Sequence, residues 1–143
     1  MKKIISILLA IVGFSCLLTS CNTHAPNTDD FDFLIQNPVL AVHCGDTIEY
    51  SAKLINKTNK KFILSHGVPL ITLYVYNYGD TPEEAVGASL IKSTIDADDS
   101  IEKNISVCFT EQGDYMLRAY CNFFVDDKEY RYEIDPVKIS VSE

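Results

Sequence analysis

The chain has 143 residues, with 12 Lys and Arg against 20 Asp and Glu, so its formal net charge is −8 at pH 7. This acidic composition argues against nucleic acid as a partner, because phosphate contacts depend on clustered Lys and Arg. The length suits one domain, which can bury a core without metals or several disulfides.

The N-terminal 20 residues have the charge and hydropathy of an export signal. Lys2 and Lys3 precede an almost continuous apolar stretch of 15 residues, from Ile4 to Leu18. A membrane-spanning helix needs about 20 apolar residues, whereas the apolar region of a signal peptide has roughly 7–15. The sequence therefore predicts a cleaved signal helix over residues 1–20.

The apolar stretch ends in Leu18-Thr19-Ser20-Cys21, which resembles the lipobox of bacterial lipoproteins. The resemblance implies cleavage before Cys21, a thioether lipid on Cys21, and acylation of the new amino terminus by a fatty acid such as palmitate. Several acyl chains give a stable membrane anchor. A location in the cell envelope follows from this resemblance. An ordinary secretory signal, with Cys21 incidental, is the alternative.

The residues after the lipobox indicate whether the lipid anchor is expected in the inner or the outer membrane. In lipoproteins of enteric bacteria, an Asp directly after the lipidated Cys marks the protein for retention in the inner membrane. In this chain the residue after Cys21 is Asn22. We therefore expect the outer membrane, on its periplasmic or its surface face. Asp29, Asp30 and Asp32 are similar to surface-export signals of Bacteroidetes lipoproteins, although they lie later in the chain.

Removing residues 1–20 changes the charge of the chain. Lys2 and Lys3 leave with the signal, so 10 basic side chains face 20 acidic ones and the net charge becomes −10. Anionic lipid should repel such a domain. We expect the lipid on Cys21 to attach the protein to the membrane. Residues 21–32 are polar and lack apolar periodicity, which predicts a flexible tether before a domain over residues 33–143.

From residue 33 onward, apolar residues recur at every second position, as in half-buried strands. No helical period follows the signal. The expected strands are 33–35 with 39–42, split by Asn37-Pro38, and then 48–54, 61–65, 70–76, 86–91, 101–109, 115–125, 129–134 and 137–141. Seven to nine short strands predict an all-β chain folded as a single β-sandwich, with a closed barrel as the alternative.

One segment resembles a known family of sandwiches. Residues 113–120, Gly-Asp-Tyr-Met-Leu-Arg-Ala-Tyr, resemble the penultimate strand of immunoglobulin-like and fibronectin type III domains. The resemblance implies that Tyr115 forms a tyrosine corner, a hydrogen bond back over the preceding corner. Residues 48–141 are also faintly similar to the bacterial intracellular proteinase-inhibitor domain, which implies a sandwich fold and no inhibitory residue.

The cysteines have different expected roles. Cys16 leaves with the signal, and Cys21 carries the lipid. Cys44, Cys108 and Cys121 then remain, either as one disulfide and one free thiol or as three buried free thiols. No C-x-x-C spacing is present, so zinc binding and thioredoxin-like chemistry are not supported.

No catalytic or cofactor motif stands out. His43 and Cys44 are adjacent, and neighbours on a strand point to opposite faces, so they are poorly placed as a Cys–His pair. Asp96, Asp98 and Asp99 resemble the start of a calcium loop, but the Gly and Glu that an EF-hand requires further on are missing. We predict no enzyme activity, no catalytic residue, no metal and no cofactor.

Tyrosines provide the candidate binding patch. Tyr74, Tyr76 and Tyr78 lie on one face of the expected strand 70–76 and in the loop after it. Tyrosine suits binding surfaces as well as the wet edge of a core. The first hypothesis is a lipid-anchored module that binds an envelope protein or another ligand. The second is an envelope protease inhibitor acting through an exposed loop, Tyr78–Ala85 or His66–Pro69.

Overall fold

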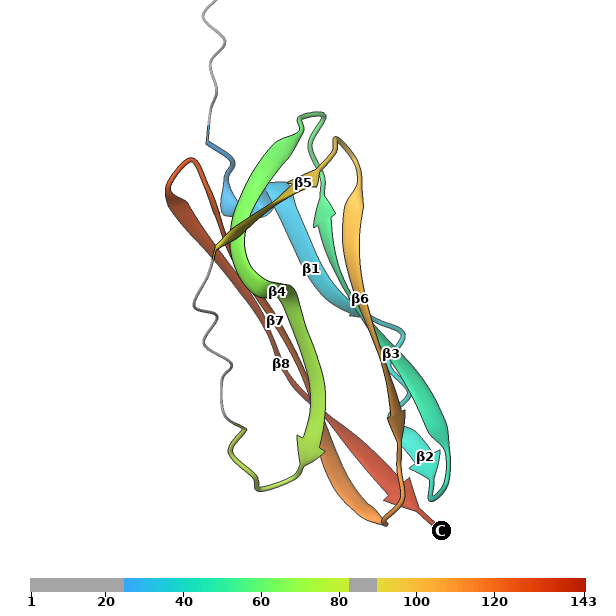
Figure 1. Cartoon of the computed structure of the whole chain (residues 1–143). Helices are drawn as coiled ribbons and strands as arrows, with labels where there is room; N and C mark the ends of the chain where they lie inside the picture. Colours follow the sequence, from blue (N-terminus) through green and yellow to red (C-terminus); the bar gives the residue numbers. More distant parts are fainter. Residues whose placement is uncertain (1–24, 83–89) are drawn as a thin grey trace, which may run out of the picture.

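The computed structural model describes residues 25–82 and 90–143. The expected signal helix and Cys21 lie outside these residues. After a short 3-10 helix, η1 (Thr28–Asp30), the described chain forms two facing sheets (Figure 1). The first has the order β1 (Phe31–Gln36), β3 (Thr47–Asn56), β6 (Ser100–Cys108). The second has the order β2 (Ala41–His43), β8 (Lys128–Ser142), β7 (Gly113–Val125), β4 (Phe62–Asn77), β5 (Ile91–Ile95).

The core lies between the two sheets and is built by alternation along each strand. In β3, the buried side chains Tyr50, Ala52 and Leu54 alternate with half-buried or exposed ones. In β7, Leu117 and Ala119 point inward in the same way. This alternation buries one face of each sheet against the other. The prediction of an all-β sandwich is confirmed, with two separate sheets instead of a closed barrel.

The tyrosine corner expected at Tyr115 is present. Its hydroxyl donates to the carbonyl oxygen of Glu111 at 3.0 Å. Its ring packs edge-on against Phe109, with 5.2 Å between the ring centroids. The orders β1-β3-β6 and β8-β7-β4-β5 correspond to strands A-B-E and G-F-C-C′ of immunoglobulin-like domains. The fold is an immunoglobulin-like sandwich.

The folded part of the chain starts earlier than the expected boundary at residue 33. Pro26 is fully buried, and β1 begins at Phe31. The hydroxyl of Tyr130 donates to the carbonyl of Pro26, and that of Tyr132 donates to the carbonyl of Thr28 at 2.7 Å. Residues 25–32 are therefore part of the domain. Their polar sequence did not indicate this because the contacts use backbone carbonyls.

Three expected strand breaks are placed differently, and one of them is absent because the expected strands 129–134 and 137–141 form a single strand, β8. At Asn37-Pro38 the chain leaves the first sheet, and β2 then pairs in parallel with β8 in the second. The expected strands 61–65 and 70–76 are one strand, β4, with an irregularity between His66 and Ile71 that includes a cis Val68–Pro69 bond. β5 spans Ile91–Ile95 instead of 86–91, and residues 86–89 lie outside the description.

The three remaining cysteines are free thiols. Cys44 and Cys108 are exposed, so neither expected arrangement, one disulfide or three buried thiols, is correct. Cys121 is buried in the core, and its burial raises the pKa of the thiol to about 12. Across residues 25–82 and 90–143, no helix is long and apolar enough to cross a membrane.

Candidate functional site

The outer face of the five-stranded sheet carries a set of half-buried aromatic and polar side chains. On β4 these include Tyr74 and Tyr76, which pair across to Arg118 and Met116 on β7. Tyr120 lies two positions beyond Arg118 on the same side of β7, as strand alternation requires. We call Tyr74, Tyr76, Met116, Arg118 and Tyr120 the tyrosine face.

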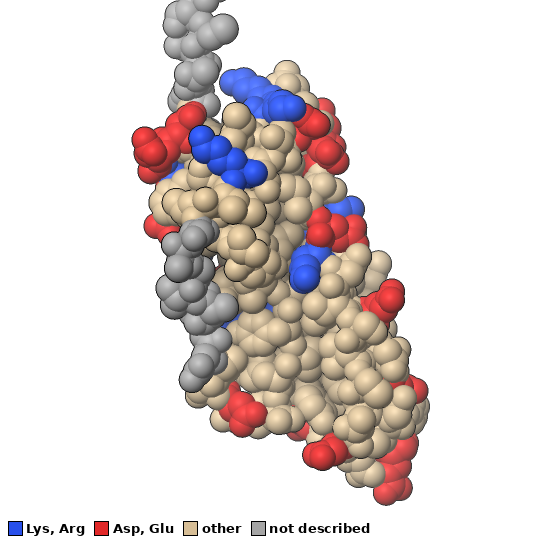
Figure 2. Space-filling model, in the orientation of Figure 1, with Lys and Arg blue, Asp and Glu red and all other residues tan. Residues whose placement is uncertain are grey.

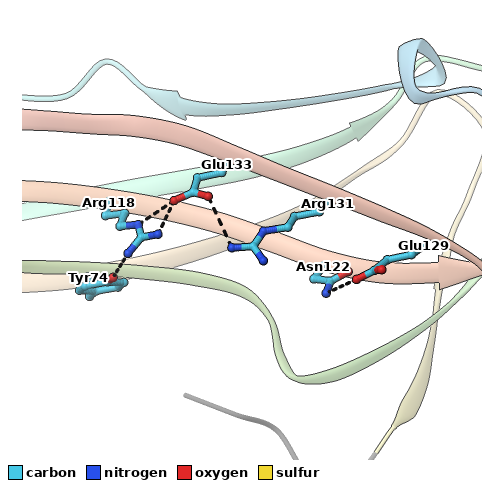
Figure 3. Close-up of polar contacts among 6 residues, drawn as sticks. All are labelled: Tyr74, Arg118, Asn122, Glu129, Arg131 and Glu133. Carbon is cyan, nitrogen blue, oxygen red and sulfur yellow. Dashed lines mark hydrogen bonds and ion pairs between the residues drawn. The ribbon is translucent and has the colours of Figure 1, made fainter. Parts of the chain in front are cut away.

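The guanidinium of Arg118 is held between Tyr74 and Glu133 (Figure 3). Its Nε donates to Glu133 Oε1 at 2.9 Å, and its Nη1 donates to the hydroxyl of Tyr74 at 3.3 Å. Its central carbon lies 5.6 Å from the centroid of the Tyr120 ring, within the range of a cation–π contact. Arg118 is therefore fixed in orientation by contacts to β4, β7 and β8.

The charges on this face are matched. The hydrogen bond from Arg118 lowers the pKa of the Glu133 carboxyl, and Arg131 lies 3.6 Å from the other carboxylate oxygen. Burial raises the pKa of Tyr74, with the hydrogen bond from Arg118 acting in the opposite direction. Further along the sheet, Asn122 donates to Glu129 at 2.8 Å (Figure 3). The face thus offers rings, donors and acceptors with nearly balanced charge.

The structure brings together two of the three tyrosines of the predicted patch and places the third, Tyr78, apart from them. The rings of Tyr74 and Tyr76 are adjacent, with centroids 5.6 Å apart and an interplanar angle of 36°. Tyr78 lies beyond the end of β4 and is 67% exposed. The ammonium of Lys138, itself 2.8 Å from Asp114, lies 5.9 Å from the centroid of the Tyr78 ring. Sequence reasoning missed Arg118, Tyr120 and Glu133, although strand alternation placed the first two on one face.

A groove of about 560 Å³ lies on the same side of the sheet, toward the β7–β8 turn. It is lined by Ile63, Ser65, Leu90, Lys92, Phe124, Asp126 and Asp127, and we call it the hairpin groove. Ser65 pairs with Phe124 on one side and with Lys92 on the other, so these three side chains form its centre. The groove combines apolar walls with one ammonium and two carboxylates.

His66 and Cys44 form hydrogen bonds with groups of the fold around them. His66 is buried, its Nδ1 donates to the carbonyl of Gly67 at 2.6 Å, and its Nε2 lies 2.8 Å from the hydroxyl of Ser93. The contact with Ser93 joins β4 to β5, whereas the bond to Gly67 lies within β4. Cys44 Sγ donates to the carbonyl of Thr110 at 3.1 Å. Among the described residues, no group of three or more His, Cys, Asp or Glu side chains could hold a metal ion.

The fold and these surfaces define an immunoglobulin-like sandwich with an aromatic outer face. No protein-family model and no curated protein sequence matches the chain. A CARDB domain from Pyrococcus furiosus, solved in complex with di-metal ions, is similar at 14% identity over 78% of this chain and 87% of that one, with a TM-score of 0.46.

Two further solved structures are similar at the same level. A PapD-like domain of human CEP192 has 15% identity over 85% of this chain and 89% of that one, with a TM-score of 0.42. A β-glucosidase from Listeria innocua, solved in complex with glucose, has 9% identity over 79% of this chain and a TM-score of 0.44. The chain spans only 16% of the length of that enzyme. None of these scores carries an argument about function.

Proposed function

We propose that the protein is a lipid-anchored binding module of the bacterial cell envelope, attached through Cys21, that contacts its partner with the tyrosine face. The fixed position of Arg118 between Tyr74 and Tyr120 carries this proposal. Tyr and Arg are enriched among the residues that dominate binding energy at protein interfaces. An Arg that is already held in place loses less conformational freedom when it binds.

The charge balance of the face favours a protein partner without a strong charge of its own. Arg118 and Arg131 both lie against Glu133, although the whole chain has a net charge of −8. A partner that approaches this face therefore meets little of the overall negative charge at short range. Long-range repulsion of acidic partners falls off within about 8 Å at physiological salt.

Site-specific photocrosslinking tests this function. A photoreactive residue replaces Tyr76 in the full chain, expressed with its leader in its own cells. The matched control carries the same residue at Lys103, which is exposed on β6 in the other sheet. We expect one dominant adduct from position 76, absent from position 103 and lost when Tyr120→Ala is added. Identical adduct profiles from the two positions would contradict the proposal.

The lipid anchor has a separate test. Metabolic labelling with a palmitate analogue should label the full chain, and Cys21→Ser should abolish the label and move the protein from the detergent phase to the aqueous phase. Cys44→Ser, which changes an exposed thiol, is the control and should leave both results unchanged. Labelling that survives Cys21→Ser would contradict anchoring through Cys21.

Protease inhibition is supported less well by the geometry. Of the segment His66–Pro69, His66 is buried within β4, and only Val68, which is 62% exposed, and Pro69 lie on the surface. The other expected loop, Tyr78–Ala85, is described only as far as residue 82. Titration against a protease panel at equimolar ratio separates the two functions, since a binding module should leave every protease active.

A further inference from the structure

We propose that the hairpin groove binds the headgroup of phosphatidylethanolamine and thereby orients the domain on its membrane. The proposal rests on the membrane anchor of the proposed function, and it uses a surface other than the tyrosine face. The first observation is where the chain enters the sandwich. Pro26 is buried beside the β7–β8 turn, where Lys128 Nζ donates to its carbonyl at 3.3 Å.

This entry point places the groove near the anchor. Five residue steps separate Cys21 from Pro26. An extended chain covers at most about 3.6 Å per residue, so Pro26 lies within about 18 Å of an acylated Cys21. Asp126 and Asp127, which line the groove, directly precede Lys128. On the face seen in Figure 2, Lys and Arg lie in the upper and middle parts together with acidic side chains, while the lower end shows acidic side chains alone.

The groove matches both charges of a zwitterionic headgroup. Asp126 and Asp127 at the turn can accept hydrogen bonds from the primary ammonium of ethanolamine, and Lys92 on β5 can pair with the phosphate. Within the described part of the chain, these three side chains form no salt bridge with another residue. Their charges are therefore available to a ligand.

The apolar part of the groove matches the start of the acyl chains. Ile63 is 58% exposed and Leu90 is 66% exposed, beside the half-buried Phe124. Large apolar side chains that gather on a surface mark contact sites for a membrane or a ligand. An anionic headgroup fits poorly, because two carboxylates face one ammonium in the groove and the whole chain is acidic. The methylated ammonium of phosphatidylcholine offers no N–H donor to Asp126 and Asp127.

Vesicle flotation tests the proposal. The protein is the chain from residue 21 onward with Cys21→Ser, which keeps every strand of the sandwich and removes the acylation site. It is mixed with vesicles of phosphatidylcholine alone, or with added phosphatidylethanolamine or phosphatidylglycerol. We expect binding to be strongest with phosphatidylethanolamine, by about tenfold over phosphatidylcholine, which corresponds to about 1.4 kcal/mol, and lowest with phosphatidylglycerol.

Variants locate the binding in the groove. Lys92→Glu and Asp126→Asn combined with Asp127→Asn should each reduce binding to phosphatidylethanolamine vesicles to the level seen with phosphatidylcholine. Lys103→Glu on β6 makes the same charge change as Lys92→Glu outside the groove and should bind like the parent. Circular dichroism and thermal unfolding confirm that each variant is folded. If both groove variants also bind like the parent, the proposal is overturned.

The outcomes separate this proposal from the proposed function. Equal binding to phosphatidylcholine and phosphatidylethanolamine vesicles overturns headgroup recognition, and leaves palmitate labelling and crosslinking from position 76 unaffected. Conversely, if Cys21 is found not to be acylated, the flotation assay still tests headgroup binding, because it uses the chain with Cys21→Ser. Tyr74→Ala, on the tyrosine face, should leave flotation unchanged. Loss of flotation in this variant would place lipid binding on the tyrosine face and contradict binding in the hairpin groove.

Discussion

Tyr130 and Pro26 are 104 positions apart, and the Tyr130 hydroxyl donates a buried hydrogen bond to the Pro26 carbonyl. The Tyr130 ring stacks on Phe123, with centroids 5.5 Å apart and an interplanar angle of 13°. The bond therefore connects the N-terminal segment to the aromatic part of the core. It determines where the chain leaves the sandwich, and so which end of the domain lies beside the predicted anchor.

Tyr130→Phe should destabilise the domain. The substitution removes the hydroxyl and leaves the buried Pro26 carbonyl with the partly exposed Lys128 bond. Because the Lys128 bond still reaches this carbonyl, the loss is that of one hydrogen bond, and we expect the free energy of unfolding to fall by about 1 kcal/mol in urea titration. Tyr132→Phe is the control, because its bond to Thr28 is exposed and should contribute less. Equal effects of the two variants would contradict this account.

Tyr115→Phe should weaken the tyrosine corner. The bond from the Tyr115 hydroxyl to Glu111 joins the start of β7 to the preceding loop, and the ring contact with Phe109 survives the substitution. We expect a loss of about 1 kcal/mol in the free energy of unfolding, the usual net value of a hydrogen bond. Tyr78→Phe removes a hydroxyl from an exposed side chain and should change stability little. An unchanged midpoint of urea unfolding for Tyr115→Phe would contradict a stabilising role of the tyrosine corner.

The three cysteines of the sandwich should react with a thiol reagent at different rates. In the Cys21→Ser chain from residue 21 onward, two thiols, Cys44 and Cys108, are exposed. Cys121 is buried with a pKa of about 12, so little reactive thiolate forms there near neutral pH. We expect two rapidly labelled thiols in the native chain and three after denaturation, counted by mass spectrometry. Rapid native labelling of Cys121 would show that it is not enclosed.

The Arg118–Glu133 pair should add a pH-dependent contribution to stability. The pKa of Glu133 is lower in the folded chain than in the unfolded one, so its contribution is fully present above the unfolded pKa and is lost as the pH falls through the folded pKa. Because the pair is partly exposed, we expect the contribution to remain below about 1 kcal/mol. Glu133→Gln should therefore be less stable than the parent near pH 7 and approach it at acidic pH.

Urea titrations of both chains at a series of pH values check this prediction. Glu49→Gln, on an exposed position of β3, provides the control for the loss of one carboxyl. A stability difference between Glu133→Gln and the parent that does not change with pH would contradict the role of the charge.

Arg118 and Tyr120 show how far alternation predicts the candidate site. Strand alternation in residues 113–120 places both on one face, and residues 70–76 do the same for Tyr74 and Tyr76. The patterns do not indicate that the two strands are neighbours in register. Arg118 meets Tyr74 across 44 positions and Glu133 across 15, and these meetings depend on the pairing of β4, β7 and β8. The hairpin groove likewise needs β5 beside β4.

The sequence by itself determined the all-β class, because it depends on local alternation, and its resemblance to immunoglobulin-like strands predicted the tyrosine corner from a short motif within one strand. The choice of a sandwich over a closed barrel was confirmed by the two separate sheets. The sequence also carries the lipobox-like segment from which the anchor is predicted. Only the tertiary structure decided that β4 is one strand, that Pro26 is part of the domain, and that Arg118 lies between Tyr74 and Tyr120. These features depend on contacts between distant residues, several through backbone carbonyls that every residue type possesses.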